Sequence, residues 1–120
     1  MAGIKKTDFS NPDETRKPEN MKMDIVDLGG VKAARFTAQP GWIWSKHVAP
    51  IVGTASCANR HIGVIFSGSV HTVSDDGTEL DLNAGDAYVI EPGHDAWTTS
   101  EEPAVGYEFD AGTIESYAKT

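Results

Sequence analysis

The sequence predicts an all-β sandwich or barrel, and two observations support that fold class. From Met23 onward, short apolar segments recur about every ten residues, with turn-forming residues between them. The chain of 120 residues contains 12 glycines and 6 prolines, an abundance typical of short strands joined by turns. No window of about 12 residues places apolar side chains at the spacing of an α-helix.

The first half of the chain contains three expected segments, each followed by glycine or proline. They are residues 24–28 before Gly29-Gly30, residues 31–37 before Pro40-Gly41, and residues 42–44, which lead through His47 to a loop at 50–53. Glycine and proline supply the backbone angles that turns between strands require.

The second half contains further segments of the same kind. They are residues 61–66, 70–73, 80–82, 87–90, 94–99 and 104–109. The clearest turn between them is Asp75-Asp76-Gly77-Thr78, because Asp-Gly is typical of tight hairpin turns. We therefore expect a hairpin around this turn.

Length and composition predict one folded domain with a polar start. Residues 1–21 are polar and contain prolines, so we expect an N-terminal arm that is flexible or docks on a partner subunit through Ile4 and Phe9. Residues 22–112 form the predicted barrel, and residues 113–120 form a C-terminal tail.

The charge of the chain argues against several classes of partner. A net charge of -8 repels nucleic-acid phosphates and anionic lipids, so we expect neither nucleic acid nor membrane as a partner. No apolar run reaches the ~18 residues of a membrane span, and the first residues lack the apolar core of a signal peptide. The single Cys57 cannot form an internal disulfide, which agrees with a cytoplasmic protein.

Four histidines and the cysteine are the candidate metal ligands of this sequence. His47, His61, His71 and His94 each lie in or beside an apolar segment. Neutral imidazole is a common metal ligand, and a thiolate favours zinc. The alternative is structural: a hydrogen-bonded histidine, favoured for His71, and a cysteine that only fills the core.

The spacing of Cys57 and His61 requires a turn if both bind one ion. Along a straight strand they would lie roughly 13 Å apart, whereas donor atoms on zinc lie about 2.0–2.3 Å from the metal. Residues 58–60 include Asn59, a plausible turn former. We therefore expect Cys57 to end one strand and His61 to begin the next.

The sequence around Gly68 resembles the first sequence motif of the cupin superfamily. That motif has two histidines, a glutamate and then a glycine. With Gly68 at the glycine position, His61 takes the glutamate position, and Ala55 and Cys57 take the two histidine positions. The substituted set keeps metal-ligand chemistry at two of these three positions.

Residues 85–94 resemble the second cupin motif, a Gly-Asp followed by Pro-x-Gly and a histidine. His94 comes two residues earlier than usual, and Ala96 stands at the usual position. A shift of two keeps the same face of a strand. Residues 22–110 resemble a bacterial branch of small single-domain cupins, most specifically in Pro92-Gly93-His94-Asp95-Ala96-Trp97.

The resemblance implies a cupin-type double-stranded β-helix, or jelly-roll barrel, with the polar arm at its start. It implies a homodimer and a metal site built from Cys57, His61 and His94. His47 is the expected fourth ligand, in place of the one lost at Ala55. The thiolate favours zinc, and nickel, iron and copper stay open as alternatives.

Two functions are compatible with such a site. The first is a metal-dependent enzyme acting on a small polar or carboxylate-bearing metabolite by isomerase, lyase or hydrolase chemistry. Asp95 is then the candidate catalytic residue, Arg60 binds a substrate carboxylate, and Trp44 and Trp97 wall the pocket. Arg60 is otherwise a surface residue and the tryptophans are core or interface residues.

The second function is a non-catalytic binding or sensor protein with a closed or absent metal site. A zinc ion with four protein ligands is structural, whereas three protein ligands leave a position for a substrate. The sequence leaves this choice open.

Overall fold

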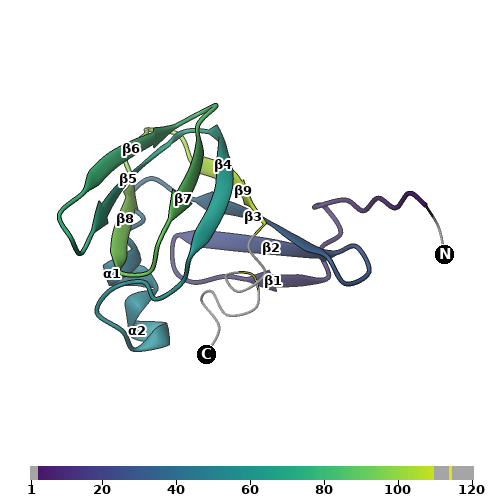
Figure 1. The fold of residues 1–120 in the computed structure, drawn as a ribbon, viewed down its shortest axis with the longest axis horizontal. Helices are drawn as coiled ribbons and strands as arrows, with labels where there is room; N and C mark the ends of the chain where they lie inside the picture. Colours follow the sequence, from purple (N-terminus) through teal and green to yellow (C-terminus); the bar gives the residue numbers. More distant parts are fainter. Residues whose placement is uncertain (1–2, 110–113, 115–120) are drawn as a thin grey trace.

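The fold consists of two antiparallel sheets (Figure 1). A computed structural model describes residues 3–109 and Ile114. The larger sheet has the order β1 (Glu14–Arg16), β2 (Met21–Asp27), β3 (Lys32–Ala38), β9 (Ala104–Glu108), β4 (His61–Ser67) and β7 (Ala87–Ile90). The smaller sheet has the order β6 (Glu79–Asn83), β5 (Ser69–Ser74) and β8 (His94–Thr98).

The strands form because apolar and polar side chains alternate along them. In β3, β4, β8 and β9 every second side chain is buried, so one face of each strand points into the space between the sheets. The core between these faces includes Met23, Ile25, Trp44 and Ile65. The predicted all-β jelly-roll architecture is confirmed.

The turn expected at residues 75–78 is present and joins β5 to β6. The N–H of Gly77 donates to the carbonyl of Ser74 at 2.9 Å, and Gly77 has a φ of 93°. The Asp76 carboxylate accepts the N–H of Thr78 at 2.9 Å, which closes the turn. The left-handed φ explains why glycine is needed at this position.

Residues 42–53 differ from the expected strand and loop, because they contain two one-turn helices. These are α1 (Trp44–His47) and α2 (Ala49–Val52). Pro50 lies in the first turn of α2, where a missing N–H costs nothing. Gly53, with a φ of 78°, ends α2. Within the described residues no helix is both long and apolar enough to cross a membrane.

Part of the predicted N-terminal arm joins the barrel of its own chain. β1 pairs with β2, with Thr15 opposite Asp24. The ring of Phe9 lies 5.3 Å from the ring of Tyr107. The first described residues, drawn in purple, project away from the sheets (Figure 1). Apart from Ile114, which is buried in the core, the predicted tail at 113–120 lies outside the described residues.

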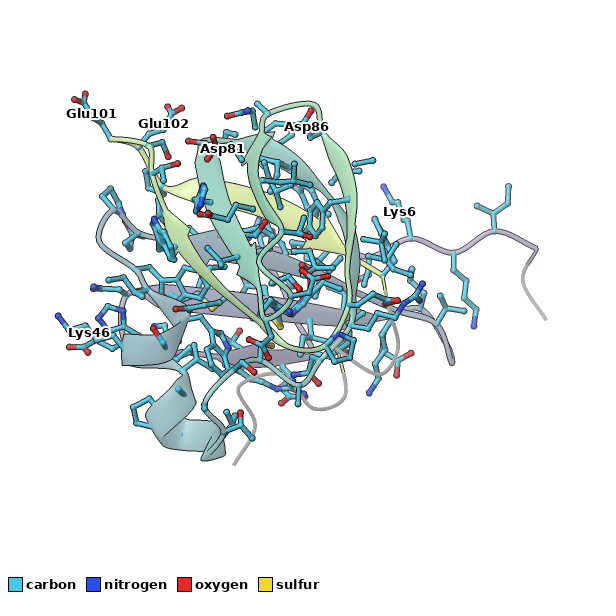
Figure 2. All side chains as sticks on the ribbon, turned by 60° about the vertical axis from the view of Figure 1, so that its left-hand side comes forward. Lys6, Lys46, Asp81, Asp86, Glu101 and Glu102 are labelled. Atoms are coloured by element: carbon cyan, nitrogen blue, oxygen red, sulfur yellow. The ribbon has the colours of Figure 1, made fainter. Side chains whose placement is uncertain are left out.

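Four acidic side chains lie together at one end of the molecule. Figure 2 shows Asp81, Asp86, Glu101 and Glu102 together at this end, with Lys6 and Lys46 away from it. These acidic side chains come from β6 and from the loops that follow β6 and β8.

Candidate metal centre

Cys57, His61 and His94 are brought together by the start of two strands and the loop before them. His61 begins β4 and His94 begins β8. Cys57 lies outside both sheets but forms a bridge with His94: its N–H donates to the His94 carbonyl at 2.8 Å. Residues 58–60 have no regular secondary structure and no assigned turn, so Cys57 and His61 meet across an irregular segment rather than across the expected turn.

The three side chains form a tight, buried group. One possible ligand atom from each lies within 4.8 Å of the other two. Cys57 Sγ is 3.5 Å from His61 Nε2. The rings of His61 and His94 are 5.0 Å apart and nearly perpendicular. All three side chains are buried, so the protein would shield a metal ion held here from bulk water.

Each histidine has its Nδ1 atom occupied, which fixes the orientation of its ring. His61 Nδ1 donates to Glu108 Oε1 at 2.8 Å, and His94 Nδ1 donates to the carbonyl of Glu91 at 2.9 Å. The tautomers follow from these acceptors, since neither oxygen can donate. In both rings Nε2 is then the nitrogen left to bind a metal ion. This is the usual outer-shell arrangement of metal-binding histidines.

Glu108 is itself held in place by a second donor. The Tyr88 hydroxyl donates to Glu108 Oε2 at 2.5 Å. Glu108 ends β9 and Tyr88 lies in β7, two strands that flank β4 in the larger sheet. The chain Tyr88–Glu108–His61–Cys57 is therefore continuous across three neighbouring strands and the loop before β4.

The surroundings shift the pKa of both members of the Cys57–His61 pair. Burial raises the pKa of the Cys57 thiol, but hydrogen bonds from His61 and His94 and their charges lower it to about 6. Burial lowers the pKa of His61, but the charge of Glu108 and the bonds to Cys57 and Glu108 raise it to about 10. A thiolate, which is the form of cysteine that binds metals, is therefore stabilised at neutral pH.

His47, the expected fourth ligand, is not brought to this group. Its Nδ1 accepts the N–H of Ile43 at 3.1 Å, and its Nε2 lies 3.5 Å from Glu19 Oε2. The reason is that residues 44–47 form the one-turn helix α1 rather than an extended strand. The described residues thus bring together three of the four predicted ligands.

Asp95 and Trp97 lie on the opposite face of β8 from His94. Asp95 Oδ1 accepts the N–H of Ser45, in the first turn of α1, at 3.0 Å. The Trp97 ring lies 5.0 Å from the ring of His71. The alternation of β8 places His94 and Ala96 inward and these two side chains outward. The structure therefore does not place Asp95 at the group or Trp97 in the cavity beside it.

Of the other two residues expected at the substrate, the structure places Trp44 at the cavity and Arg60 away from it. Arg60 Nε donates to Glu91 Oε1 at 2.6 Å in an exposed ion pair, and Arg60 does not line the cavity. Trp44 does line it, together with Trp42. His71, for which a structural role was favoured, donates to Asp81 and Glu79 on the outer face of β5.

A cavity lies beside the group, between the two sheets. His61, His94, Tyr88 and Glu108 contribute its polar part. The rest is predominantly apolar: Met21, Met23, Phe36, Trp42, Trp44, Ile65, Val70, Leu82, Ile90 and Ala96, with Thr72. About 50 Å³ is open to the centres of water-sized molecules, several times the 10–15 Å³ or so that one water needs.

Glu108 is the residue of the site that sequence reasoning missed. The cupin motifs end before it, so the resemblance gave no reason to select it. A signal does exist in the alternation of the last strand: Ala104, Gly106 and Glu108 share the inward face. A glutamate in a row that faces the core requires a buried hydrogen-bond partner, and here His61 and Tyr88 provide it.

Solved structures of several proteins are similar to this chain. A Lactobacillus farciminis oxalate decarboxylase, crystallised as a formate complex, has a TM-score of 0.59 and 20% identity over 87% of this chain. The polyketide cyclase RemF from Streptomyces resistomycificus has a TM-score of 0.63 and 15% identity, covering 88% of this chain and 77% of RemF. The Cupin_2 domain of an XRE-family transcriptional regulator from Enterobacter cloacae has a TM-score of 0.54 and 12% identity, covering 75% of this chain and 94% of that domain.

These similarities concern the fold alone. This chain spans only 32% of the oxalate decarboxylase. No protein-family model and no curated protein sequence matches the chain. The arrangement of two antiparallel sheets around an inner cavity, together with these structural similarities, leads to one conclusion: the chain has the cupin fold that its sequence resemblance predicted.

Proposed function

We propose that this protein binds a divalent metal ion through Cys57, His61 and His94 and acts on a small molecule in the adjoining cavity. One observation supports the proposal above all. Three ligand-type atoms converge within 4.8 Å, and both histidines have their other ring nitrogen engaged. This is the usual arrangement around a metal ion, in which the second ring nitrogen of each histidine ligand is hydrogen-bonded.

The donor set fits zinc best among the candidate metals. A thiolate with two imidazoles matches the ligands that zinc prefers, and nickel, iron and copper remain alternatives. Three protein ligands leave a fourth position, and His61 and His94 both line the cavity. When bound, zinc in such a site polarises a carbonyl group or lowers the pKa of a water molecule.

The protein side chains around the cavity have separate roles in this proposal. Glu108 holds His61 in the orientation that presents Nε2, and Tyr88 holds Glu108. Trp42 and Trp44 wall the cavity and exclude water from the ligand. Isomerase, lyase or hydrolase chemistry suits such a centre. Two of the structurally similar proteins, the oxalate decarboxylase and the polyketide cyclase, are named for reactions on small molecules.

A non-catalytic binding protein is the second candidate, and one observation favours it. Among the described residues that line the cavity, Glu108 is the single carboxylate, and both its oxygens already accept hydrogen bonds. The group expected to transfer protons, Asp95, faces the other way. Binding without chemistry requires no further proton-transfer group.

Metal analysis of the purified protein tests the ligand assignment. We expect one zinc per chain after loading, and loss of zinc in Cys57→Ser, His61→Ala and His94→Ala. His71→Ala is the control, because His71 lies on the outer face of β5 and should not affect the zinc content. Circular dichroism shows whether each variant has folded. Full zinc occupancy in all three folded variants would refute the proposal.

Cobalt substitution separates an open site from a closed one. A cobalt form of the protein should change its visible spectrum when imidazole, an uncharged ligand, is added, because a three-ligand site has room for an exogenous ligand. A spectrum that does not respond to imidazole indicates a fully coordinated ion and favours the binding protein.

A further inference from the structure

The lining of the cavity indicates which ligands it accepts. We infer that the cavity binds an uncharged small molecule, with an apolar body and one donor atom that reaches the Cys57–His61–His94 group. The inference builds on the proposed metal centre and specifies its ligand. It replaces the carboxylate-bearing metabolite expected from the sequence.

The apolar part of the cavity is its larger part. Ten of the fifteen lining residues are apolar, including Phe36, Trp42 and Leu82. The Thr72 hydroxyl is already used, because it donates to the carbonyl of Leu80 at 3.1 Å. Transfer of an apolar ligand body out of water into this lining is favourable. The indole N–H groups of Trp42 and Trp44, both lining residues, are buried without a hydrogen-bond partner in the described part of the chain. The lining residues therefore offer donors to an accepting oxygen of the ligand but few partners to further hydroxyl groups.

No lysine or arginine lines the cavity among the described residues. Arg60, the residue expected to bind a substrate carboxylate, instead donates to Glu91 at an exposed position. Arg35 also binds an acidic partner, Asp24, at 3.2 Å. A buried carboxylate without a cationic partner is costly. The walls therefore select against anionic ligands.

The charge of the proposed centre leads to the same conclusion. A divalent ion contributes two positive charges, and the Cys57 thiolate and the Glu108 carboxylate contribute one negative charge each. The two histidines are neutral when they bind metal. The buried centre is thus balanced, and an anionic ligand would leave one uncompensated negative charge. A carbonyl, amide or hydroxyl oxygen keeps the balance.

The size and flexibility of the cavity limit the ligand to a short chain or a single ring. About 50 Å³ is open to the centres of water-sized molecules, less than the engineered cavity of roughly 150 Å³ that binds benzene. Met21 and Met23 line the cavity, and methionine side chains adapt to the shape of a ligand. A single ring therefore requires these side chains to move.

Three probes test the inference: benzamide, benzoate and acetamide. Benzamide and benzoate have similar shapes but differ in charge, and acetamide lacks the apolar body. In zinc-loaded protein we expect benzamide to bind at least about tenfold more tightly than either of the others, since an unpaired buried charge or a lost apolar contact costs this much. Titration calorimetry and the fluorescence of Trp42 and Trp44 report binding.

Metal-free protein is titrated in parallel, and the zinc content is measured independently. We expect the same order of affinities, because the apolar walls, which contain no lysine or arginine among the described residues, are the same without the ion. A protein that holds no zinc but prefers benzamide refutes the proposed function and supports this inference. Benzoate binding as tightly as benzamide, or no binding of benzamide at its solubility limit, overturns the inference whatever the zinc content.

A matched pair of variants locates the selectivity in the cavity. Ile90 lines the cavity opposite His61 in the ladder, whereas Val89, one residue earlier, is exposed on the outer face. Ile90→Lys should tighten benzoate binding by about tenfold through the new ion pair, and Val89→Lys should leave it unchanged. An equal effect of both variants would mean that benzoate responds to net charge alone and would contradict the assignment to the cavity.

Discussion

Glu108 is a buried carboxylate whose two oxygens serve two different strands. One oxygen accepts from His61 in β4 and the other from Tyr88 in β7. A buried carboxylate is stable only with such partners. These two hydrogen bonds use both carboxylate oxygens, and neither of them goes to Cys57. The role of Glu108 at the proposed centre is therefore to position His61.

The first prediction concerns Glu108→Gln. The amide oxygen still accepts from His61 but lacks the negative charge, so zinc affinity should fall by about 10–100-fold. Competition with a chelator of known affinity measures the change. Glu91→Gln is the control, because the Glu91 side chain binds Arg60 while its backbone carbonyl serves His94. Unchanged zinc affinity in Glu108→Gln would contradict the positioning role.

The second prediction concerns the pH dependence of His71. Hydrogen bonds to Asp81 and then Glu79 raise its pKa above 6.5. A raised pKa means that the charged ring stabilises the fold fully below pH 6.5, and that this small contribution is lost as the pH rises through the folded pKa. Titration followed by NMR should give a midpoint above 6.5. Asp81→Asn should lower the midpoint, and a midpoint at or below 6.5 in the native chain would disprove the prediction.

The contact between α1 and β8 gives Asp95 a structural role at the scale of the elements. Ile43, the residue before α1, makes no side-chain bond to the helix end. Asp95 supplies that bond from the neighbouring strand by accepting the N–H of Ser45. A one-turn helix has too few internal hydrogen bonds to be stable alone. The contact therefore contributes to holding α1 against the barrel.

The third prediction is that Asp95→Ala lowers stability and leaves metal binding intact. Loss of a helix-capping carboxylate costs about 0.5–2 kcal/mol, which urea denaturation measures. Zinc content and benzamide affinity should not change, since Asp95 faces away from His94. Asp95→Asn is the companion variant, because its amide oxygen still accepts the N–H of Ser45 and should keep most of the stability. Loss of zinc in folded Asp95→Ala would contradict this prediction and would mean that Asp95 contributes to the metal site.

The outer face of the larger sheet exposes several large apolar side chains. Ile62, Val64 and Phe66 are exposed in a row along β4, and Val89 lies opposite Ile62 on β7. The Phe66 ring is 6.0 Å from that of Tyr107 on β9. A continuous apolar patch across three strands is typical of a surface that a partner covers. The homodimer expected from the resemblance stays a prediction, and this face is where a second copy would bind.

The fourth prediction is that Phe66→Glu produces a monomer. A charge in the centre of the patch would be buried without a partner in a dimer, at a cost that opposes association. Sedimentation at micromolar concentration should give a dimer for the native chain and a monomer for the variant. Leu80→Glu is the control, because Leu80 is exposed to a similar extent but lies on β6 in the other sheet. A native monomer, or monomers from both variants, would contradict the proposed interface.

Local chemistry made the strands and turns of this fold predictable. The alternation in β3, β8 and β9 and the Asp-Gly turn act over a few residues, so the sequence alone reveals them. The helices α1 and α2 were not predictable in this way. Each has a single turn, and Asp95, which binds the first turn of α1, is distant in sequence.

Patterns along the chain were enough to predict the all-β class, the cupin fold and the ligand-type residues Cys57, His61 and His94. Which of the predicted site residues meet depends on the folded arrangement, which brings these three together, places His47 near Glu19 and turns Asp95 outward. It also selected Glu108 as the partner of His61 from a strand 47 positions later. A site forms where side chains converge in space. This depends on the order of the strands in each sheet and on which face of its strand each side chain occupies, rather than on which residues are neighbours in the sequence.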